Sequence, residues 1–210
     1  MMNKEIYDYL DELIPNPKCE LNYNKDYELL IATMLSAQTT DKKVNEATKI
    51  LFKKYKTIDE LAKADIDDIK KIIMPIGTYN KKAKNVIEIA KKLCKDYQGK
   101  VPNNREYLES LSGVGRKTTN VVLSNLFNVP CIAVDTHVKR VSERLGISNH
   151  DDDVYTVEKK LNKCIPQEKL SKLHHQLVLF GRYHCKAIKP DCSNCKIRKY
   201  CKKKSWFNYC

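Results

Sequence analysis

Hydrophobic residues recur at intervals of three and four along most of the chain. Val44, Ala47 and Leu51 share one helical face, and Val138, Val141 and Leu145 share another. No stretch alternates between apolar and polar residues as a half-buried strand does. The pattern predicts an all-α fold with helices at about 3–14, 26–37, 41–55, 58–63, 66–74, 80–96, 104–110, 117–127, 136–145, 153–163 and 168–182.

Residues at the predicted helix ends support these boundaries. Asp41 and Asp67 stand where a side-chain oxygen caps the first turn of a helix. Gly99 and Gly146 stand where helices end. Glycine and proline are otherwise scarce, so we expect no long flexible linker.

The composition and net charge of the chain indicate what kind of partner it binds. A chain of 210 residues with 42% hydrophobic residues can bury a core, and its formal charge of +13 favours a polyanion, nucleic acid first. Because 33 of the 39 basic residues are lysine, a general lysine bias is an alternative source of part of this charge. Only six residues are arginine, which favours contacts with the nucleic-acid backbone over base reading.

The chain shows no signal peptide and no run of transmembrane length. We therefore expect an intracellular, cytoplasmic protein that does not bind a membrane. Nine cysteines in such a compartment do not suggest a disulfide framework.

The segment LSGVGRKTTNVVL at 111–123 predicts a tight glycine turn between two helices. Gly113 and Gly115 give access to backbone angles closed to other residues and let backbone N–H groups approach a ligand. Together with the positive end of the next helix, these donors suit a phosphate. A plain helix connection is the alternative.

Lys117 begins the helix after this turn. At a helix N-terminus, beside Arg116 and partly buried, its neutral amine would be favoured, as a Schiff-base nucleophile requires. A lysine that holds a phosphate as a point charge is the alternative, and the turn alone does not decide between them. Asp135, at the predicted N-cap of the next helix, is either an ordinary cap or a carboxylate that assists Lys117.

The last 26 residues are rich in Cys and Lys and poor in aliphatic residues, so they cannot build a core. Four cysteines, Cys185, Cys192, Cys195 and Cys201, have spacings that suit either tetrahedral zinc or a [4Fe–4S] cluster. The insert KAIKPD, which carries Lys186 and Lys189, would face phosphate if a metal fixed this loop. The remaining thiols, Cys19, Cys94, Cys131, Cys164 and Cys210, are expected to serve in packing or to be incidental.

The hairpin, the motif VDTHV and the C-x6-C-x2-C-x5-C tail, in this order and at these separations, resemble the endonuclease III family. These are bifunctional DNA glycosylases and abasic lyases of the helix-hairpin-helix superfamily. The likeness includes ELLIATMLSAQTTDKKVN at 28–45 and IGTYNKKAKNV at 76–86. It implies a six-helix barrel domain with the hairpin at 20–130, a discontinuous iron–sulfur domain at 1–19 and 131–210, and a substrate cleft between them.

The resemblance also implies roles for individual residues in a monomeric enzyme that removes oxidised pyrimidines from duplex DNA. Lys117 matches the nucleophile, Asp135 matches the essential carboxylate, and Gln38 matches the residue that enters the gap left by the flipped base. The four tail cysteines match the ligands of the [4Fe–4S] cluster. Further DNA contacts are expected from Gly113, Val114, Gly115, Arg116, Thr78, Tyr79, His137, Lys186 and Lys189.

Two positions depart from the family pattern. Ser112 stands where the hairpin usually has proline, and Thr78 stands where better-known members carry a leucine that wedges into the opposite strand. A smaller, polar wedge should unstack DNA less well.

Three other identities remain open from the sequence. An adenine-mismatch glycosylase shares the hairpin and the cluster but typically lacks the lysine and has an additional domain. The others are a non-enzymatic DNA-binding module and an electron carrier.

Overall fold

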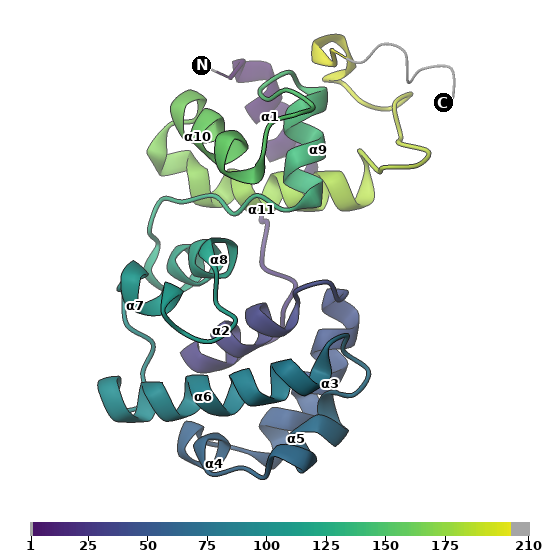
Figure 1. Cartoon of the computed structure of the whole chain (residues 1–210). Helices are drawn as coiled ribbons and strands as arrows, with labels where there is room; N and C mark the ends of the chain where they lie inside the picture. Colours follow the sequence, from purple (N-terminus) through teal and green to yellow (C-terminus); the bar gives the residue numbers. More distant parts are fainter. Residues whose placement is uncertain (1, 203–210) are drawn as a thin grey trace. The chain divides into compact units, whose positions relative to one another are not determined.

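The computed structural model describes residues 2–202 and confirms the predicted all-α fold. The described residues form helices and turns, without a strand (Figure 1). In chain order the helices are α1 (Lys4–Leu13), α2 (Asp26–Leu35), α3 (Asp41–Lys54), α4 (Ile58–Ala62), α5 (Ile66–Ile73), α6 (Tyr79–Tyr97), α7 (Arg105–Glu109), α8 (Arg116–Phe127), α9 (Thr136–Arg144), α10 (Val154–Cys164), α11 (Gln167–Tyr183) and a 3₁₀ turn at Arg198–Tyr200. Among these residues, no helix combines the length and apolar character needed to cross a membrane.

The chain divides into two compact units. One is the continuous stretch Cys19–Phe127, and the other combines Met1–Lys18 with Asn128–Cys210. Each unit has its own buried core.

Helix α2 forms the centre of the unit Cys19–Phe127. Its residues from Tyr27 to Leu35 are all buried, including the polar residues Glu28 and Thr33. Most of these residues are apolar, and a helix that is apolar nearly all round must be covered on every side. It packs against α3, α6 and α8, and α4 and α5 cover another part of α6 (Figure 1).

Two predicted caps lie at the wrong residue. The N-cap of α3 is Thr40, which accepts a bond from the N–H of Lys43, and Asp41 is the first helical residue. The N-cap of α5 is Asp65, whose carboxylate accepts bonds from the N–H groups of Asp67 and Asp68. Sequence reasoning found the right helices but not the capping residue, because several capping side chains stand within one turn.

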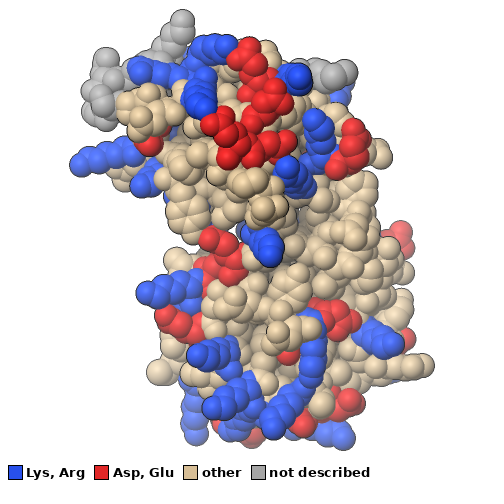
Figure 2. Space-filling model, turned by 180° about the vertical axis from the view of Figure 1, so that it is seen from behind, with Lys and Arg blue, Asp and Glu red and all other residues tan. Residues whose placement is uncertain are grey.

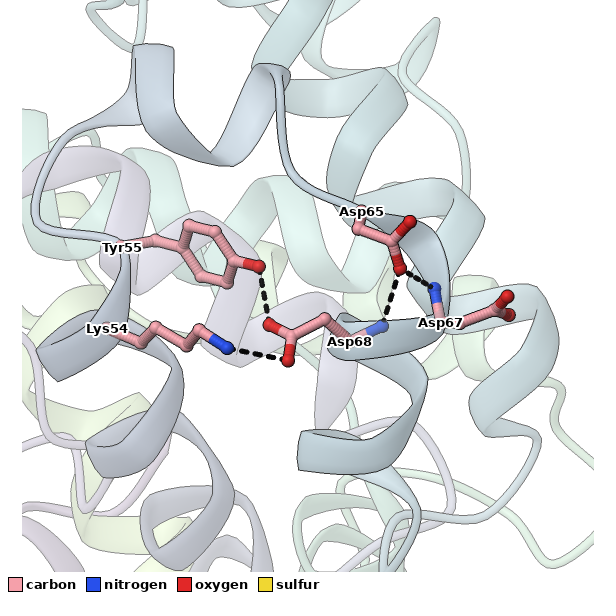
Figure 3. A network of polar contacts seen from close by, with 5 residues as sticks. All are labelled: Lys54, Tyr55, Asp65, Asp67 and Asp68. Carbon is pink, nitrogen blue, oxygen red and sulfur yellow. Dashed lines mark hydrogen bonds and ion pairs between the residues drawn. The ribbon is translucent and has the colours of Figure 1, made fainter.

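A polar network ties α3 to α5 (Figure 3). The carboxylate of Asp68 accepts a hydrogen bond from the Tyr55 hydroxyl at 2.5 Å and forms an ion pair with Nζ of Lys54 at 2.6 Å. The Lys54 contact lowers the pKa of Asp68, and the Tyr55 bond lowers it further.

The second unit is built around α11. Helices α1 and α9 pack against α11, and α10 packs against α9 (Figure 1). The ring of Tyr9 on α1 meets the ring of Phe180 on α11 edge to face, with centroids 6.2 Å apart. The main-chain N–H of Met2 donates to the carbonyl of Cys164 at 3.2 Å, so the N-terminal helix is an integral part of this unit.

Candidate functional site

The glycine turn between α7 and α8 requires glycine at only one of its two positions. Gly113 has φ +77°, and a Cβ there would overlap the Nδ2 atom of Asn85 on α6. Gly115 does not have positive φ, so the expectation that it needs an angle closed to other residues is wrong. No heavy atom lies within 4 Å of a Cβ placed on Gly115, so this position leaves the backbone open to an outside group.

The turn presents backbone donors rather than side chains. The side chain of Val114 is buried, and its N–H closes the turn by donating to Leu111 at 3.1 Å. The carbonyl of Gly115 accepts the first bond of α8, from the N–H of Thr119 at 3.0 Å. The earlier N–H groups of α8 have no carbonyl partner within the helix, and they add the positive end of the helix dipole.

Lys117 lies in the first turn of α8 and is exposed, as is Arg116. The expectation that Lys117 is partly buried is therefore wrong. The buried face of α8 begins later, at Thr119 and Asn120, and the first turn projects beyond it. An exposed amine at this place can be reached by a large ligand.

Gln38 and Thr78 are also exposed, and both have left-handed backbone angles, with φ +56° and +57°. Tyr79, directly after Thr78, is half-buried. Left-handed φ is costly for residues other than glycine and is found where the structure imposes it, frequently at functional sites. Lys189, another expected DNA contact, has φ +49°. Three of the five described non-glycine residues with positive φ are thus expected DNA contacts.

Lys82 is a residue that the sequence interpretation missed. Its side chain is 5% exposed, and its ammonium donates to the carbonyls of Leu35 and Ala37, on either side of the end of α2. These bonds lie at the end of α2, which is Leu35 and not residue 37 as predicted. A signal was present in the sequence, since Lys82 shares a helical face with Val86, Ile89 and Leu93.

Asp135 is the N-cap of α9, as predicted. Its Oδ1 atom accepts the N–H of Val138 at 2.8 Å, and the residue is half-buried. His137 follows on the first turn, and burial lowers its pKa more than the Asp135 carboxylate raises it. Nδ1 of His137 lies 3.2 Å from a guanidinium nitrogen of Arg140.

The four tail cysteines lie around a single hollow. Cys185, Cys192, Cys195 and Cys201 all line it. Its wall is completed by the apolar side chains of Leu145, Phe180 and Ile197 together with Pro190, Asp191, Arg144 and Arg198. Among the described residues, no group of three or more His, Cys, Asp or Glu side chains is arranged around one ion position. The shared hollow and the four soft sulfur donors nevertheless fit an iron–sulfur group.

Arg144 fastens the cysteine loop to α9. This arginine is 7% exposed, and one guanidinium nitrogen lies 3.2 Å from Sγ of Cys185 and 2.8 Å from the carbonyl of Lys186. The main-chain N–H of Lys202 donates to the carbonyl of Arg144 at 2.8 Å. Burial raises the pKa of the Cys195 thiol, and a bound cation would favour the thiolate that ligation needs.

Residues 186–189 of the insert between the first two cysteines, Lys186 and Lys189 among them, are exposed. Cys19, Cys94 and Cys164 are half-buried and Cys131 is buried, whereas Cys210 lies outside the described residues. Figure 2 shows one face of the molecule, on which acidic side chains gather over the unit that contains α1 and basic side chains lie among them. That face is therefore not a continuous basic surface.

The expected site residues are shared between the two units. The unit Cys19–Phe127 carries the hairpin, Lys117, Gln38, Thr78 and Tyr79, and the other unit carries Asp135, His137, the loop lysines and the cysteine hollow.

Comparison with known proteins identifies the family. Residues 31–167, more than half of the chain, match the HhH-GPD superfamily of base excision DNA repair proteins. Endonuclease III of Bacillus subtilis is 47% identical, with 93% of this chain and 89% of the relative covered. Endonuclease III of Escherichia coli K12 is 44% identical, with 97% and 98% covered.

The chain belongs to the endonuclease III family. As a member of that family it is a DNA N-glycosylase and abasic-site lyase of base excision repair.

Solved structures agree with this assignment. A trapped endonuclease III–DNA covalent intermediate superposes with a TM-score of 0.89 at 46% identity, covering 96% of this chain and 97% of that one. A thermostable thymine-DNA glycosylase superposes with a TM-score of 0.83 at 26% identity, covering 99% and 97%. The fold of the endonuclease III family therefore extends over nearly the whole chain.

Proposed function

We propose that this endonuclease III family member removes oxidised pyrimidines from duplex DNA and cleaves the resulting abasic site through a Schiff base on Lys117. The observation that carries the proposal is the exposed Lys117 amine in the first turn of α8, directly after a turn whose backbone is open at Gly115. An amine that must reach a sugar carbon has to be exposed before DNA binds.

The hairpin binds the DNA backbone in this proposal. The N–H groups of the turn and of the first turn of α8 donate to a phosphate, and Gly115 allows the phosphate to come close. The cation of Arg116 adds to the attraction. These contacts set the register of the duplex against Lys117 and carry no sequence information.

Gln38, Thr78 and Tyr79 act on the duplex interior. The damaged nucleotide rotates out of the stack at a cost of a few kcal/mol, which is lower for a base that already pairs badly. Gln38 enters the gap, while Thr78 faces the opposite strand as a small wedge. The exposure of Gln38 and Thr78 and their left-handed backbones support this assignment.

The neutral amine of Lys117 attacks C1′ of the flipped nucleotide as the glycosidic bond breaks, and the base leaves with the bonding electron pair and takes up a proton. Opening of the sugar ring gives an imine between Nζ and C1′. The imine acidifies the C2′ proton, and after a base removes it the electron pair expels the 3′ phosphate.

Asp135 supplies the carboxylate of the reaction. It stabilises positive charge that develops on the sugar, or it takes a proton from the attacking amine. His137 contacts DNA near it.

Cys185, Cys192, Cys195 and Cys201 would hold a [4Fe–4S] cluster, which supplies structural cross-linking of the tail. The chain's own part is to fix the insert that carries Lys186 and Lys189, so that both ammonium groups meet the DNA backbone at a set place. The hydrogen bonds from Arg144 and the apolar wall of the hollow support this role.

The domain assignment follows from the same proposal. The unit Cys19–Phe127 is the six-helix barrel domain, and the unit that contains both chain ends is the iron–sulfur domain. The enzyme works as a monomer on double-stranded DNA and resides inside the cell with the genome.

The decisive experiment is borohydride trapping on a duplex with one preformed abasic site. The wild-type enzyme should become covalently attached to DNA, Lys117→Gln should not, and Lys100→Gln, the removal of another exposed lysine of the same unit, should behave as wild type. Trapping and nicking by Lys117→Gln at the wild-type level would remove Lys117 from this role. The absence of trapping with the wild-type enzyme would overturn the Schiff-base step.

A further inference from the structure

A lysine points into the core of the unit Cys19–Phe127 from the apolar stripe of α6. Lys82 is 5% exposed, and the neighbouring residues of its stripe, Val86 and Ile89, are fully buried. Burying an ammonium is costly unless hydrogen-bond acceptors replace the water that it loses. Such a lysine in a core therefore calls for a specific use.

The acceptors of Lys82 all come from one short segment. Nζ lies 2.9 Å from the carbonyl oxygen of Leu35, 2.7 Å from that of Ala37 and 3.3 Å from Oγ1 of Thr39. An ammonium has three protons to donate, and these three acceptors use all of them. The cation also lies at the negative end of the α2 dipole, where positive charge is favoured.

Two of these acceptors belong to the residues directly before and after Gln38. Ala37 and Thr39 are its two chain neighbours, and Gln38 itself has the left-handed φ of +56°. A residue with a Cβ pays roughly 1–2 kcal/mol for that conformation, so the surrounding bonds have to impose it. Because the ammonium bonds to the residues on both sides of Gln38, the chain is held there while the Gln38 side chain stays exposed.

The same lysine is linked to the Thr78 turn. The main-chain N–H of Lys82 donates to the carbonyl of Thr78 at 3.1 Å, and Thr78 is the left-handed N-cap of α6. The backbone of Lys82 thus bonds to Thr78, and its side chain bonds to Ala37 and Thr39, the two neighbours of Gln38. Thr78 and Gln38 are both left-handed. Both left-handed residues are assigned here to the DNA interior.

We propose that Lys82 is a positioning residue for base extrusion: its buried ammonium holds the Gln38 loop in the conformation that enters the duplex. The inference rests on the proposed role of Gln38. Lys82 is not a second nucleophile, because its three protons are all donated and its Nζ is enclosed by the end of α2, whereas Lys117 is exposed.

The test compares two activities of the same variants. Excision of thymine glycol from a duplex requires extrusion of the base, whereas nicking of a preformed abasic site depends much less on filling a gap behind a base. Lys82→Met keeps most of the aliphatic packing and removes the ammonium. Lys84→Met makes the same change at an exposed position of the same helix and is the matched control.

We expect Lys82→Met to lower the excision rate on the order of 10- to 100-fold, the range expected for a misplaced group, and to lower nicking of the abasic site by less than about threefold. Lys84→Met should match wild type in both assays. Gln38→Ala should show the same imbalance as Lys82→Met, and the double variant should be no worse than either single variant, because both remove one function.

A second measurement covers the case in which Lys82→Met folds poorly. Thr39→Val removes one of the three acceptors from a half-buried position, and it should speed amide hydrogen exchange at residues 36–40 and lower excision selectively. The inference would be overturned by wild-type activity of Lys82→Met, by an equal loss of both activities in a Lys82→Met protein that unfolds in urea as wild type does, or by additive effects of the two single substitutions. Wild-type excision by Thr39→Val together with faster exchange at residues 36–40 would also overturn it. Each of these results leaves Lys117 trapping by the wild-type enzyme intact, so it is distinct from failure of the proposed chemistry.

Discussion

Gly113 lies directly against the side-chain amide of Asn85, so that a Cβ at residue 113 would overlap its Nδ2 atom. Asn85 is itself buried on α6, and it has little room to withdraw. The hairpin turn is therefore shaped by a polar side chain from a different helix, in addition to its own left-handed backbone at φ +77°.

This contact predicts that Gly113→Ala destabilises the protein. The left-handed backbone and the overlap with Asn85 together should cost about 2 kcal/mol or more. Urea unfolding followed by circular dichroism measures the loss. An alanine variant as stable as wild type would show that the turn adapts freely.

Gly115→Ala should leave stability nearly unchanged and weaken DNA binding. A methyl group at residue 115 meets no atom within 4 Å, so we expect the free energy of unfolding to change by less than about 1 kcal/mol. The methyl group would stand between the backbone and a phosphate, so the affinity for an abasic-analogue duplex should fall severalfold. Fluorescence anisotropy at fixed salt measures this, and unchanged affinity would place the phosphate elsewhere.

The two roles of Asp135 can be separated by Asp135→Asn. Asparagine caps helices as well as aspartate does, so the free energy of unfolding should stay within about 0.5 kcal/mol of wild type, while excision is largely lost with the carboxylate. Asp153→Asn is the matched control, since Asp153 caps α10 by the same bond, to the N–H of Thr156 at 2.7 Å. If Asp135→Asn retained excision, Asp135 would serve only as the N-cap of α9.

Removal of one cysteine of the hollow should release bound iron and weaken DNA binding. Cys195→Ala takes away one of the four thiols around the hollow, and without a cross-link the insert with Lys186 and Lys189 loses its fixed placement. Iron content per chain and duplex affinity are the measurements. Cys164→Ala, at a half-buried thiol of the same unit that does not line the hollow, should keep full iron, and full iron in both variants would contradict the proposal.

Alkaline pH should weaken the junction of α3 and α5. Burial, and then the bond to Asp68, raise the pKa of Tyr55 to about 12 from its ordinary 10.0. The folded protein therefore holds this proton longer than the unfolded chain, and the contribution of Tyr55 is complete below pH 10.0 and is lost as pH rises through about 12.

Tyr55→Phe removes this titration. We expect it to cost about 1 kcal/mol near neutral pH, the usual net worth of one hydrogen bond, and to flatten the fall in stability above pH 10.0. Urea unfolding at a series of alkaline pH values checks this. Asp68→Asn should also flatten the slope, because it removes the carboxylate that opposes ionisation of Tyr55, and an undiminished slope in both variants would contradict the assignment.

Features that depend on neighbouring residues in the chain were predictable from the sequence. The helices, the glycine stop at Gly146 and the cap at Asp135 follow from periodicity and from residue types within one turn. The cap of α5 was missed by two residues because Asp65 and Asp67 both suit the position and only the folded turn selects between them.

Features that depend on a second helix were not predictable. The overlap of Asn85 with a Cβ on Gly113 and the grip of Lys82 on the end of α2 both come from α6, far away in the sequence. The exposure of Lys117 depends on which face of α8 is covered by α2 and α7. Roles in chemistry came from the family resemblance, because spacing alone left each of these residues with an ordinary structural alternative.

The discontinuous unit also constrains the order in which the two units can fold during synthesis. Helix α1 leaves the ribosome before α11, yet its apolar residues Ile6 and Leu10 share a core with Leu173 and Phe180 of α11. The stretch Cys19–Phe127 is continuous, so it can complete its own core while α1 still waits for a partner. If Cys201 is a ligand of iron, as we propose, iron would be acquired among the last events in maturation, after the hairpin has already formed.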